Sequence, residues 1–584
     1  MCGITVFFKF CKVDENDIKL IHLSNKEMSY RGPDEQDIWS YENIILGQVR
    51  LSIIGLSNGH QPLFSEDKNL VLVCNGEIYN YKALKKDLIN KGHTFSSDSD
   101  SEVILHLYEE YEEKLFEKLD GMFAFCLYDL TKKRMLVSRD RSGKKPLYYS
   151  KVNNGFVFSS ELKVIKKYFL KEISINYDVL RQVQQYSYSI SPDETYINGI
   201  YKVPFSSYSL ITNHTTHIQF KKYYKRVIDN TFRGTYQDAC DEIRRLLFLS
   251  VEKRLQSDVP VGVLLSAGID SSAISSIARE MKENVNVISL GYKGHHSIDE
   301  RLEAKKLSKL KGFIWNEVEL DINHYSGYFQ EILSILDEPN ADDAMFAQWG
   351  IYKYANSKGY KVLLSGNGGD ELFYGYNSHN NYALGLNFIK EKSLQFPISS
   401  RKAVIKFLFQ QFLDILFKKK KIHYNKLNLK MELPVMNELK ILASESAIPL
   451  YRNDWHRDHY SNEIENVYYF LHYAWLTNNC YFLSDKLAMA NSIEMRSPFA
   501  DLDLINFVDT LPFEFKFKEG CPKQLLKDSL LDILPPLVLN RPKSGFTPPY
   551  EYMQSIIKQY NNKHFTEKPI TYSQLVTDYF AYNA

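Results

Sequence analysis

The sequence has few features that would tie it to a membrane, to nucleic acid or to a disulfide framework. No apolar run is long enough to cross a bilayer, and the N-terminus lacks the pattern of a signal peptide. Seven cysteines, an odd number with no Cys-x-x-Cys pair, argue against paired disulfides and structural zinc, and favour a reducing, cytoplasmic compartment. A net charge of +1 gives no reason to expect nucleic acid as a partner.

The chain is long enough for more than one domain, each with its own core. It has 584 residues, of which 44% are hydrophobic and 24% are charged, as in soluble globular proteins. One apolar and basic segment, residues 401–422, contains four consecutive lysines. Such a segment can lie on a membrane surface, but a packed helix with a solvated lysine cluster is the simpler interpretation. We therefore base no function on it.

Two turns that follow apolar strands indicate a nucleotide site. The first lies in residues 261–272, Val-Gly-Val-Leu-Leu-Ser-Ala-Gly-Ile-Asp-Ser-Ser. Backbone N–H groups at such a turn and at the following helix N-terminus bind phosphate, and Ser266 and Ser271 add hydroxyl donors. An ordinary turn capped by Asp270 and Ser271 is the alternative. The second turn, in residues 362–376, is rich in glycine and ends in two carboxylates, so the two turns together predict a magnesium-nucleotide site.

The first residues of the chain place a thiol next to a removable methionine. Loss of Met1 would leave Cys2 as the terminal residue, at the start of an apolar strand. An α-amino group titrates at about pH 8, which suits it to accept the thiol proton, and the resulting thiolate is a strong nucleophile. A cysteine after Met1 is usually incidental, so this interpretation depends on the motifs that follow.

Four motifs downstream of Cys2 carry a resemblance to a known family. They are Arg31-Gly32-Pro33-Asp34, Arg50-Leu51-Ser52-Ile53, Asn75-Gly76-Glu77-Ile78-Tyr79-Asn80 and Ser99-Asp100-Ser101-Glu102. In this order they resemble the N-terminal-cysteine glutaminase domain of the asparagine synthetase family. The resemblance implies an N-terminal-nucleophile αββα sandwich, with two sheets between helical layers, over residues 1–215.

The same resemblance assigns roles to individual residues of this half. Cys2 attacks the side-chain amide of glutamine, and Asn75 with the Gly76 N–H forms the oxyanion hole. An Arg50 guanidinium suits the glutamine α-carboxylate, and an Asp100 carboxylate suits its ammonium group. The expected glutamine-binding residues are Arg50, Asn75, Glu77 and Asp100. Taken singly, Arg50 with Asp100 could be a surface ion pair, and Asn75-Gly76 a hairpin turn.

Apolar strands alternate with helical stretches in the second half, after a polar linker in residues 213–234. Strands are predicted in residues 261–265, 286–290, 315–318 and 362–364. This order predicts a doubly wound parallel α/β sheet in residues 236–584, with ligands outside the carboxyl ends of the strands. The resemblance continues here through the ATP-pyrophosphatase domain of the asparagine synthetase family. The whole chain is therefore expected to combine α+β and α/β folds.

By this resemblance the second half binds ATP and magnesium. The expected ATP-binding residues are Leu264, Ser266, Gly268, Asp270, Ser271, Leu290, Ser365 and Gly366. Asp270 and Asp370 are expected to hold magnesium, a hard cation that prefers oxygen ligands. One departure is Ala267, where the family usually has glycine. A methyl group is tolerable there if Ala267 needs no positive φ.

A lysine in the motif Arg541-Pro542-Lys543 matches the catalytic lysine of the family. An ammonium group at Lys543 would neutralise the leaving pyrophosphate and the oxyanion that forms when ammonia attacks an acyl-adenylate. Without the resemblance, Lys543 would be interpreted as a solvated loop residue.

The expected function is glutamine-dependent, ATP-consuming amidation of a carboxylate through an acyl-adenylate, with release of AMP and pyrophosphate. Its partners are three small molecules, namely glutamine, ATP and the acceptor, and a homodimer is left open. Asparagine synthetases usually have Glu at the position of Asn367, and Asp342 and Asp343 precede the second turn. These departures favour a sugar (uronic) acid of surface polysaccharide biosynthesis as the acceptor.

Three alternatives stay open. The first is the family's usual activity, asparagine synthesis from aspartate. The second is a nucleotide-binding scaffold that has kept the fold and lost the chemistry, and the third is a glutaminase with an inactive synthetase half. Release of pyrophosphate from ATP distinguishes the scaffold from the enzymes.

Overall fold

The computed structural model describes residues 2–294, 299–377, 379–380, 462–518, 520–541, 548–564 and 571–584. Lys543 and the basic segment 401–422 lie outside these residues. The described strands form three sheets, two of them antiparallel and one parallel. Among the described helices, none combines the length and the apolar character that a membrane span requires.

The first half of the chain is a sandwich of two antiparallel sheets. The first sheet has the order β10-β8-β9-β1-β3-β2, built from β1 (Cys2–Lys9), β2 (Glu35–Tyr41), β3 (Ile44–Arg50), β8 (Tyr148–Val152), β9 (Gly155–Ser159) and β10 (Ile200–Lys202). The second has the order β12-β11-β7-β6-β5-β4, built from β4 (Leu63–Phe64), β5 (Leu70–Ile78), β6 (Gly121–Asp129), β7 (Arg134–Arg139), β11 (Ser207–Ile211) and β12 (Lys221–Lys222).

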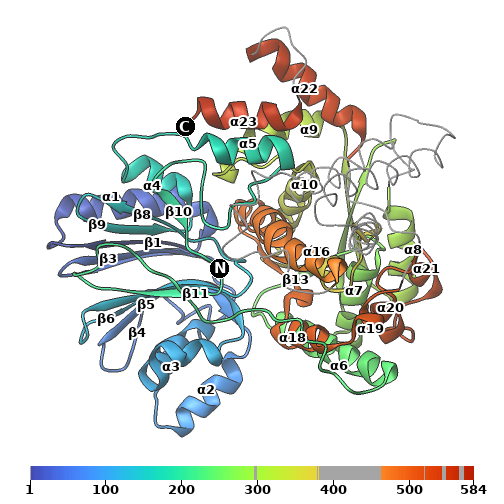
Figure 1. Cartoon of the computed structure of the whole chain (residues 1–584), viewed down its shortest axis with the longest axis horizontal. Coiled ribbons are helices and arrows are strands. Elements are labelled where there is room, and N and C mark those ends of the chain that lie inside the picture. The colour runs from blue at the N-terminus through green and yellow to red at the C-terminus, as the bar shows by residue number, and fades with distance from the viewer. Residues whose placement is uncertain are drawn as a thin grey trace, which may run out of the picture.

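Helices cover the outer faces of both sheets. On the first sheet lie α1 (Glu15–Glu27) and α4 (Leu162–Tyr168), and on the second lie α2 (Tyr81–Asn90) and α3 (Val103–Tyr111), as Figure 1 shows. The remaining helices of this half are η1 (Ser29–Arg31), η2 (Asp100–Glu102), η3 (Glu112–Glu117) and α5 (Tyr177–Tyr186). This arrangement confirms the predicted αββα layers.

Strand periodicity decides which side chains face the space between the two sheets. In β1, Ile4 and Val6 enter the inter-sheet core together with Val71 and Val73 of β5. Phe7 instead packs on the helical side of its sheet. Because side chains two residues apart lie on the same face of a strand, Cys2 faces the same side of β1 as Ile4, and Asn75 faces the same side of β5 as Val73. The end of the sandwich therefore brings Cys2 and Asn75 toward one another from different sheets.

The second half is built on a parallel sheet. Its order is β15-β14-β13-β16-β17, with β13 (Val261–Leu264), β14 (Asn286–Tyr292), β15 (Ile314–Leu320), β16 (Val362–Leu364) and β17 (Glu494–Arg496). One face is covered by α6 (Tyr236–Arg254), α7 (Ile269–Met281) and α8 (Arg301–Lys311), and the other by α9 (Ile322–Leu336), α10 (Ala344–Ser357) and α17 (Phe482–Met489). The doubly wound prediction and its four strands are confirmed. β17 was not predicted, because three residues carry too little periodicity to identify a strand.

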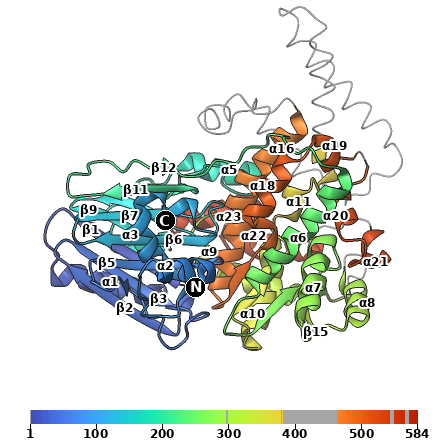
Figure 2. The same cartoon turned by 90° about the horizontal axis from the view of Figure 1, so that it is seen from below.

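Further helices complete the second half around this sheet. They are α11 (Gly369–Leu372), α16 (Glu463–Leu471), the π-helical η5 (His472–Tyr481), η6 (Pro498–Ala500), α18 (Leu502–Thr510), α19 (Phe513–Lys516), α20 (Gln524–Ser529), α21 (Pro536–Leu539), α22 (Tyr550–His564) and α23 (Tyr572–Tyr582). The C-terminal α23 packs against α5 of the first half, with the Tyr196 and Phe580 rings 5.3 Å apart. Figure 2 shows the two halves side by side.

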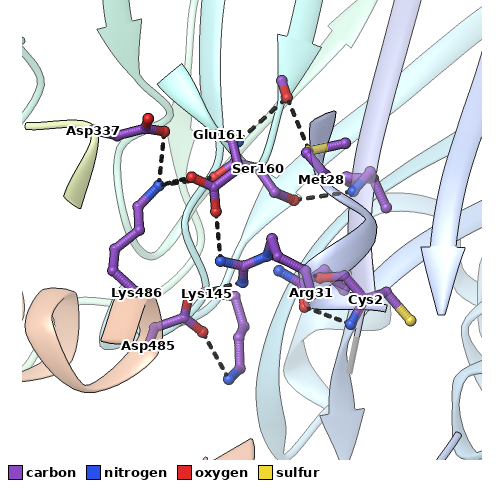
Figure 3. Close-up of polar contacts among 12 residues, drawn as sticks. Cys2, Met28, Arg31, Lys145, Ser160, Glu161, Asp337, Asp485 and Lys486 are labelled. Atoms are coloured by element: carbon purple, nitrogen blue, oxygen red, sulfur yellow. Dashed lines mark hydrogen bonds and ion pairs between the residues drawn. The ribbon is translucent and has the colours of Figure 1, made fainter. Parts of the chain in front are cut away.

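A buried set of charges joins the two halves (Figure 3). We call it the Arg31 network, and it consists of Arg31, Lys145, Glu161, Asp337, Asp485 and Lys486. The Arg31 guanidinium lies 2.7 Å from Glu161 Oε1 and 2.7 Å from Asp485 Oδ2. Lys486 Nζ lies 2.6 Å from Glu161 Oε2 and 3.2 Å from Asp337 Oδ2. Three cations thus balance three carboxylates, which makes burial of so many charges tolerable.

We predict that Lys486→Met lowers the free energy of unfolding by about 3–5 kcal/mol, because it leaves two buried carboxylates without their shared cation. The matched control is Lys353→Met, which breaks an ion pair with Glu331 in which each side chain is 43% exposed. Such surface pairs contribute at most about 1 kcal/mol. Urea denaturation followed by tryptophan fluorescence measures both. Equal losses in the two variants would contradict a stabilising role for the network.

Candidate active sites

The first site surrounds Cys2 at the end of the sandwich. Cys2 is 4% exposed, and its backbone N–H donates to Asn75 Oδ1 at 3.2 Å. Asn75 Nδ2 is buried and has no hydrogen-bond acceptor within the described part of the chain. An unused amide donor beside the proposed nucleophile is costly unless a ligand oxygen accepts from it. The arrangement therefore suits Asn75 to stabilise an oxyanion formed at Cys2.

The neighbouring Gly76 is required by its surroundings. A Cβ atom built there would lie 2.3 Å from the carbonyl oxygen of Met122, a contact that any side chain would make. Asn75 and Gly76 both lie inside β5, where they pair with Ala124 and Phe123 of β6. The alternative of a hairpin turn at Asn75-Gly76 is therefore wrong.

Arg50 is the direct cross-strand neighbour of Cys2 in the β1–β3 pair. Its guanidinium donates to the carbonyls of Ile54 and Gly55, at 3.1 and 2.7 Å, and pairs with Glu35 at 3.0 Å. These contacts fix the guanidinium beside the cysteine. The alternative of a surface ion pair with Asp100 is wrong, because Arg50 is buried and its carboxylate partner is Glu35.

Asp100 is held on the other side of the site by the backbone of β5. Its Oδ2 accepts from the Ile78 N–H at 2.6 Å, and the side chain is buried. Burial raises the pKa of Asp100 to about 6, although the Ile78 N–H works in the opposite direction. This carboxylate is thus ionised at neutral pH and suited to an ammonium group.

Glu77 has a partner in the other half of the protein. Its Oε2 lies 3.1 Å from Arg496 Nη2, and Arg496 belongs to β17 of the parallel sheet. Burial raises the pKa of Glu77 well above its ordinary value, and the Arg496 guanidinium opposes that rise. The structure therefore places Glu77 at the junction between the halves, a partnership that the sequence motif did not indicate.

The second site is a cavity of about 540 Å³ at the carboxyl ends of the parallel strands. Every residue predicted to bind ATP or magnesium lines it. These residues are Leu264, Ser266, Gly268, Asp270, Ser271, Leu290, Ser365, Gly366 and Asp370. The two turns that the sequence singled out thus meet in one place, as expected for neighbouring parallel strands.

The first turn is closed by its own hydroxyl groups. The Ser266 N–H donates to Ser271 Oγ at 3.1 Å, and the Ser271 hydroxyl donates to the Gly268 carbonyl at 3.2 Å. Ala267 has a φ of +56° and is buried, so the condition stated for tolerating its methyl group is not met. The left-handed conformation costs an alanine about 1 kcal/mol relative to glycine, and the surrounding contacts must offset this cost.

Lys523 joins the two carboxylates expected to hold magnesium. Its Nζ contacts Asp270 Oδ2 and lies 2.6 Å from Asp370 Oδ1. Burial opposes the charge on Lys523, but the two carboxylates outweigh it and raise the lysine pKa above its ordinary value. Both carboxylates thus converge on one cation position, which fits the oxygen donors that magnesium prefers. The motif Lys523-Gln524-Leu525-Leu526 resembles the family, but sequence reasoning gave this lysine no role.

Other charged and polar groups complete the cavity wall. Arg541 donates to the Ser266 carbonyl at 3.0 Å and pairs with Glu300 at 2.8 Å. Asn367 donates to Ser484 Oγ at 3.0 Å. The acids Asp342 and Asp343 and the aromatic residues Tyr376 and Trp475 also line the cavity.

Asp342 is a partly buried acid of this wall. Its Oδ2 accepts from Asn479 Nδ2 at 2.5 Å. Burial raises its pKa, and the hydrogen bond from Asn479 limits the rise. The acids of this part of the wall are unfavourable for an acceptor that places a second carboxylate against them.

The comparisons with known proteins cover both halves. Residues 1–224 match the family model of the glutamine amidotransferase domain, and residues 242–581 match that of asparagine synthase. Asparagine synthetase [glutamine-hydrolyzing] 1 of Bacillus subtilis (strain 168) is 31% identical, with 100% of this chain and 93% of that protein covered. Asparagine synthetase [glutamine-hydrolyzing] 3 of the same organism is 28% identical, with 94% and 87% covered.

A third relative comes from a plant. Asparagine synthetase [glutamine-hydrolyzing] 2 of Oryza sativa subsp. japonica is 32% identical over 64% of this chain and 60% of that protein. The synthase model alone spans more than half of the chain, and the first relative spans all of it. The chain therefore belongs to the family of glutamine-hydrolysing asparagine synthetases, which are ligases of the amidotransferase type.

Proposed function

We propose that the protein hydrolyses glutamine at Cys2, passes the ammonia to the cavity of the parallel sheet, and amidates there a carboxylate that ATP has activated as an acyl-adenylate. The observation that carries this proposal is that all nine described residues assigned to ATP and magnesium line one cavity. A nucleotide-binding scaffold would share that gathering. The retained Cys2 and Asn75 of the sandwich weigh against a scaffold that has lost its chemistry.

The glutaminase step uses groups of the sandwich. Once Met1 is removed, the Cys2 amine accepts the thiol proton, and the thiolate attacks the glutamine amide carbon. The tetrahedral oxyanion accepts hydrogen bonds from Asn75 Nδ2 and the Gly76 N–H. Arg50 binds the α-carboxylate and Asp100 binds the ammonium group, so the side-chain amide is held at Cys2. The buried Nδ2 of Asn75 supports this assignment.

The synthetase step uses the two turns. Their backbone N–H groups and the hydroxyls of Ser266 and Ser271 bind the ATP phosphates. Asp270 and Asp370 are the residues that would hold magnesium, which when bound neutralises phosphate charge. Lys523 contacts both carboxylates, so its ammonium is close enough to pair with phosphate oxygens. Lys543 is assigned the family's catalytic role and lies outside the described residues.

The acceptor is proposed to be a sugar (uronic) acid of surface polysaccharide biosynthesis. Asn367 lacks the carboxylate that asparagine synthetases usually have there, and an amide cannot accept a proton from an incoming amine. Asp342 and Asp343 add negative charge to the wall, which disfavours the two carboxylates of free aspartate. Tyr376 and Trp475 give the same cavity flat apolar faces for a larger acceptor.

Asparagine synthesis from aspartate is the second candidate. It is favoured by the relatives, all three of which are named glutamine-hydrolysing asparagine synthetases. Arg541 and Lys523 also line the cavity, and cations there reduce the repulsion of a dicarboxylate. The two candidates share every step except recognition of the acceptor.

We predict that Cys2→Ala abolishes glutamine hydrolysis and leaves amidation driven by ammonium salts intact, because the two reactions use separate sites. Glutamate release and AMP release are measured in parallel, with glutamine or ammonium chloride as the nitrogen source. The control is Cys11→Ala, an exposed cysteine near the end of β1. Glutamine hydrolysis at the parent rate in Cys2→Ala would reject the nucleophile assignment.

We predict that the KM for glutamine rises about tenfold between pH 7.5 and pH 5. The raised Asp100 pKa of about 6 means that its carboxylate is charged above that pH and becomes neutral below it, so pairing with the glutamine ammonium is lost as the pH falls. Asp100→Asn is the control, with a high KM at every pH. A parent KM that stays constant across this range would contradict the role of Asp100.

We predict that free L-aspartate is a poor acceptor and that a uronic acid, as a nucleotide sugar or lipid-linked glycan, is preferred. The assay supplies ATP, magnesium, glutamine and a panel of carboxylates, and mass spectrometry identifies the amide formed. Asparagine formed with a kcat/KM of about 10⁴ M⁻¹s⁻¹ or more would support the second candidate instead.

A further inference from the structure

A second group of ionisable side chains lies on the outer face of the second sheet, away from Cys2. It consists of Glu66 in the β4–β5 turn, His93 after α2, and His106 and Glu109 in α3. We call these four residues the His93–His106 cluster. None of them belongs to the motifs assigned to glutamine or ATP. None of the four is thus a predicted ligand of glutamine or ATP.

The spacing within the cluster matches a compact cation site. One ligand atom from each of the four residues lies within 4.8 Å of the other three. His106 Nδ1 is 2.8 Å from Glu109 Oε2, and His93 Nδ1 is 3.3 Å from the same oxygen. Ligands of a tetrahedral zinc ion, at bond lengths of about 2.0–2.1 Å, are separated by about 3.3–3.5 Å. Small side-chain shifts would bring all four ligands to that spacing.

The surroundings of His106 also resemble those of a metal ligand. Its side chain is fully buried, and Nε2 has no hydrogen-bond partner within the described residues. That nitrogen lies 3.8 Å from Glu102 Oε1, and Glu102 accepts from the backbone N–H groups of Ser96 and Ser97. A histidine that binds metal through one ring nitrogen usually turns the other toward such a carboxylate. The burial and the neighbouring acid thus supply the support that ligating histidines have.

Ring packing restricts both histidines to this arrangement. The His106 ring contacts the Phe95 ring edge-on, with centroids 4.5 Å apart, and the His93 ring lies 4.9 Å away. His106 and Glu109 are three residues apart in α3, so both project from the same helix face. His106 and Glu109 are thus held by a helix, and ring packing orients the two histidines before any ion binds, which lowers the entropic cost of binding.

We propose that Glu66, His93, His106 and Glu109 bind a divalent transition-metal ion of the zinc type, which ties α3 to the β4–β5 turn and to the segment after α2. Two imidazoles and two carboxylates suit zinc in four-coordinate geometry, and magnesium, which prefers an all-oxygen shell, is a poor match. The role is structural, since the ion would link three segments that are distant in sequence. Such an ion stabilises the folded chain by its binding free energy.

The test uses the full-length protein, stripped with EDTA and dialysed without ATP. Titration calorimetry with zinc chloride is expected to give one site per chain at micromolar affinity or tighter, and magnesium chloride is expected to give no binding at this site. Bound cobalt(II) is expected to show the visible absorption of tetrahedral nitrogen and oxygen ligation without a thiolate charge-transfer band. The melting temperature is expected to rise with zinc.

Matched variants locate the site. His93 and Glu66 are not fully buried, so the variants His93→Ala and Glu66→Gln should fold. Each variant is expected to weaken zinc binding at least tenfold and to remove the rise in melting temperature. His22→Ala, an exposed histidine of α1, is the control and is expected to bind zinc as the parent does. Absence of zinc binding in the parent, equal affinity in His93→Ala, or a thiolate band with cobalt would overturn the proposal.

Discussion

The packing of the two halves depends on the ion pairs of the buried Arg31 guanidinium. It pairs with Glu161 of its own half and with Asp485 of α17 in the other half, and all three side chains are buried. Its Nε also donates to the carbonyl oxygen of Cys2 at 3.3 Å. A charge placed so deeply must keep all of its partners, because any missing one leaves an uncompensated ion in a medium of low polarity. The position of Cys2 and the docking of the halves therefore constrain one another.

Arg496 makes a second connection of this kind. It ends β17, pairs with Glu77 of the sandwich, and donates to the backbone carbonyls of Arg254 and Gln256. Its own carbonyl accepts from the Ser365 N–H, at the start of the second nucleotide turn. One residue thus contacts the motif that contains Asn75 and the turn that contains Gly366. The proposed transfer of ammonia requires the two sites to keep such a fixed relation.

Much of the architecture could be predicted from the sequence, because local patterns determine it. Largely apolar runs in residues 2–8 and 70–74 indicate buried strands, whereas the αββα layering came from the resemblance to the family. In the second half, short apolar runs that alternate with helices are typical of a parallel sheet covered on both faces. β17 could not be found in this way, because its three residues take their conformation from pairing with β16. The positive φ of Ala267 could not be predicted from the sequence either, because an alanine does not indicate a left-handed conformation.

The sequence by itself determined the residue types available for chemistry, namely the thiol after Met1, the amide of Asn75 and the paired carboxylates of two turns. Only the tertiary structure decided their partners. The fold brings together residues that the sequence gives no reason to group. Examples are Glu35 beside Arg50, Lys523 between Asp270 and Asp370, and His93 near His106. The physical reason is that electrostatic and hydrogen-bond energies depend on distances of a few ångströms, and packing of the sheets sets those distances.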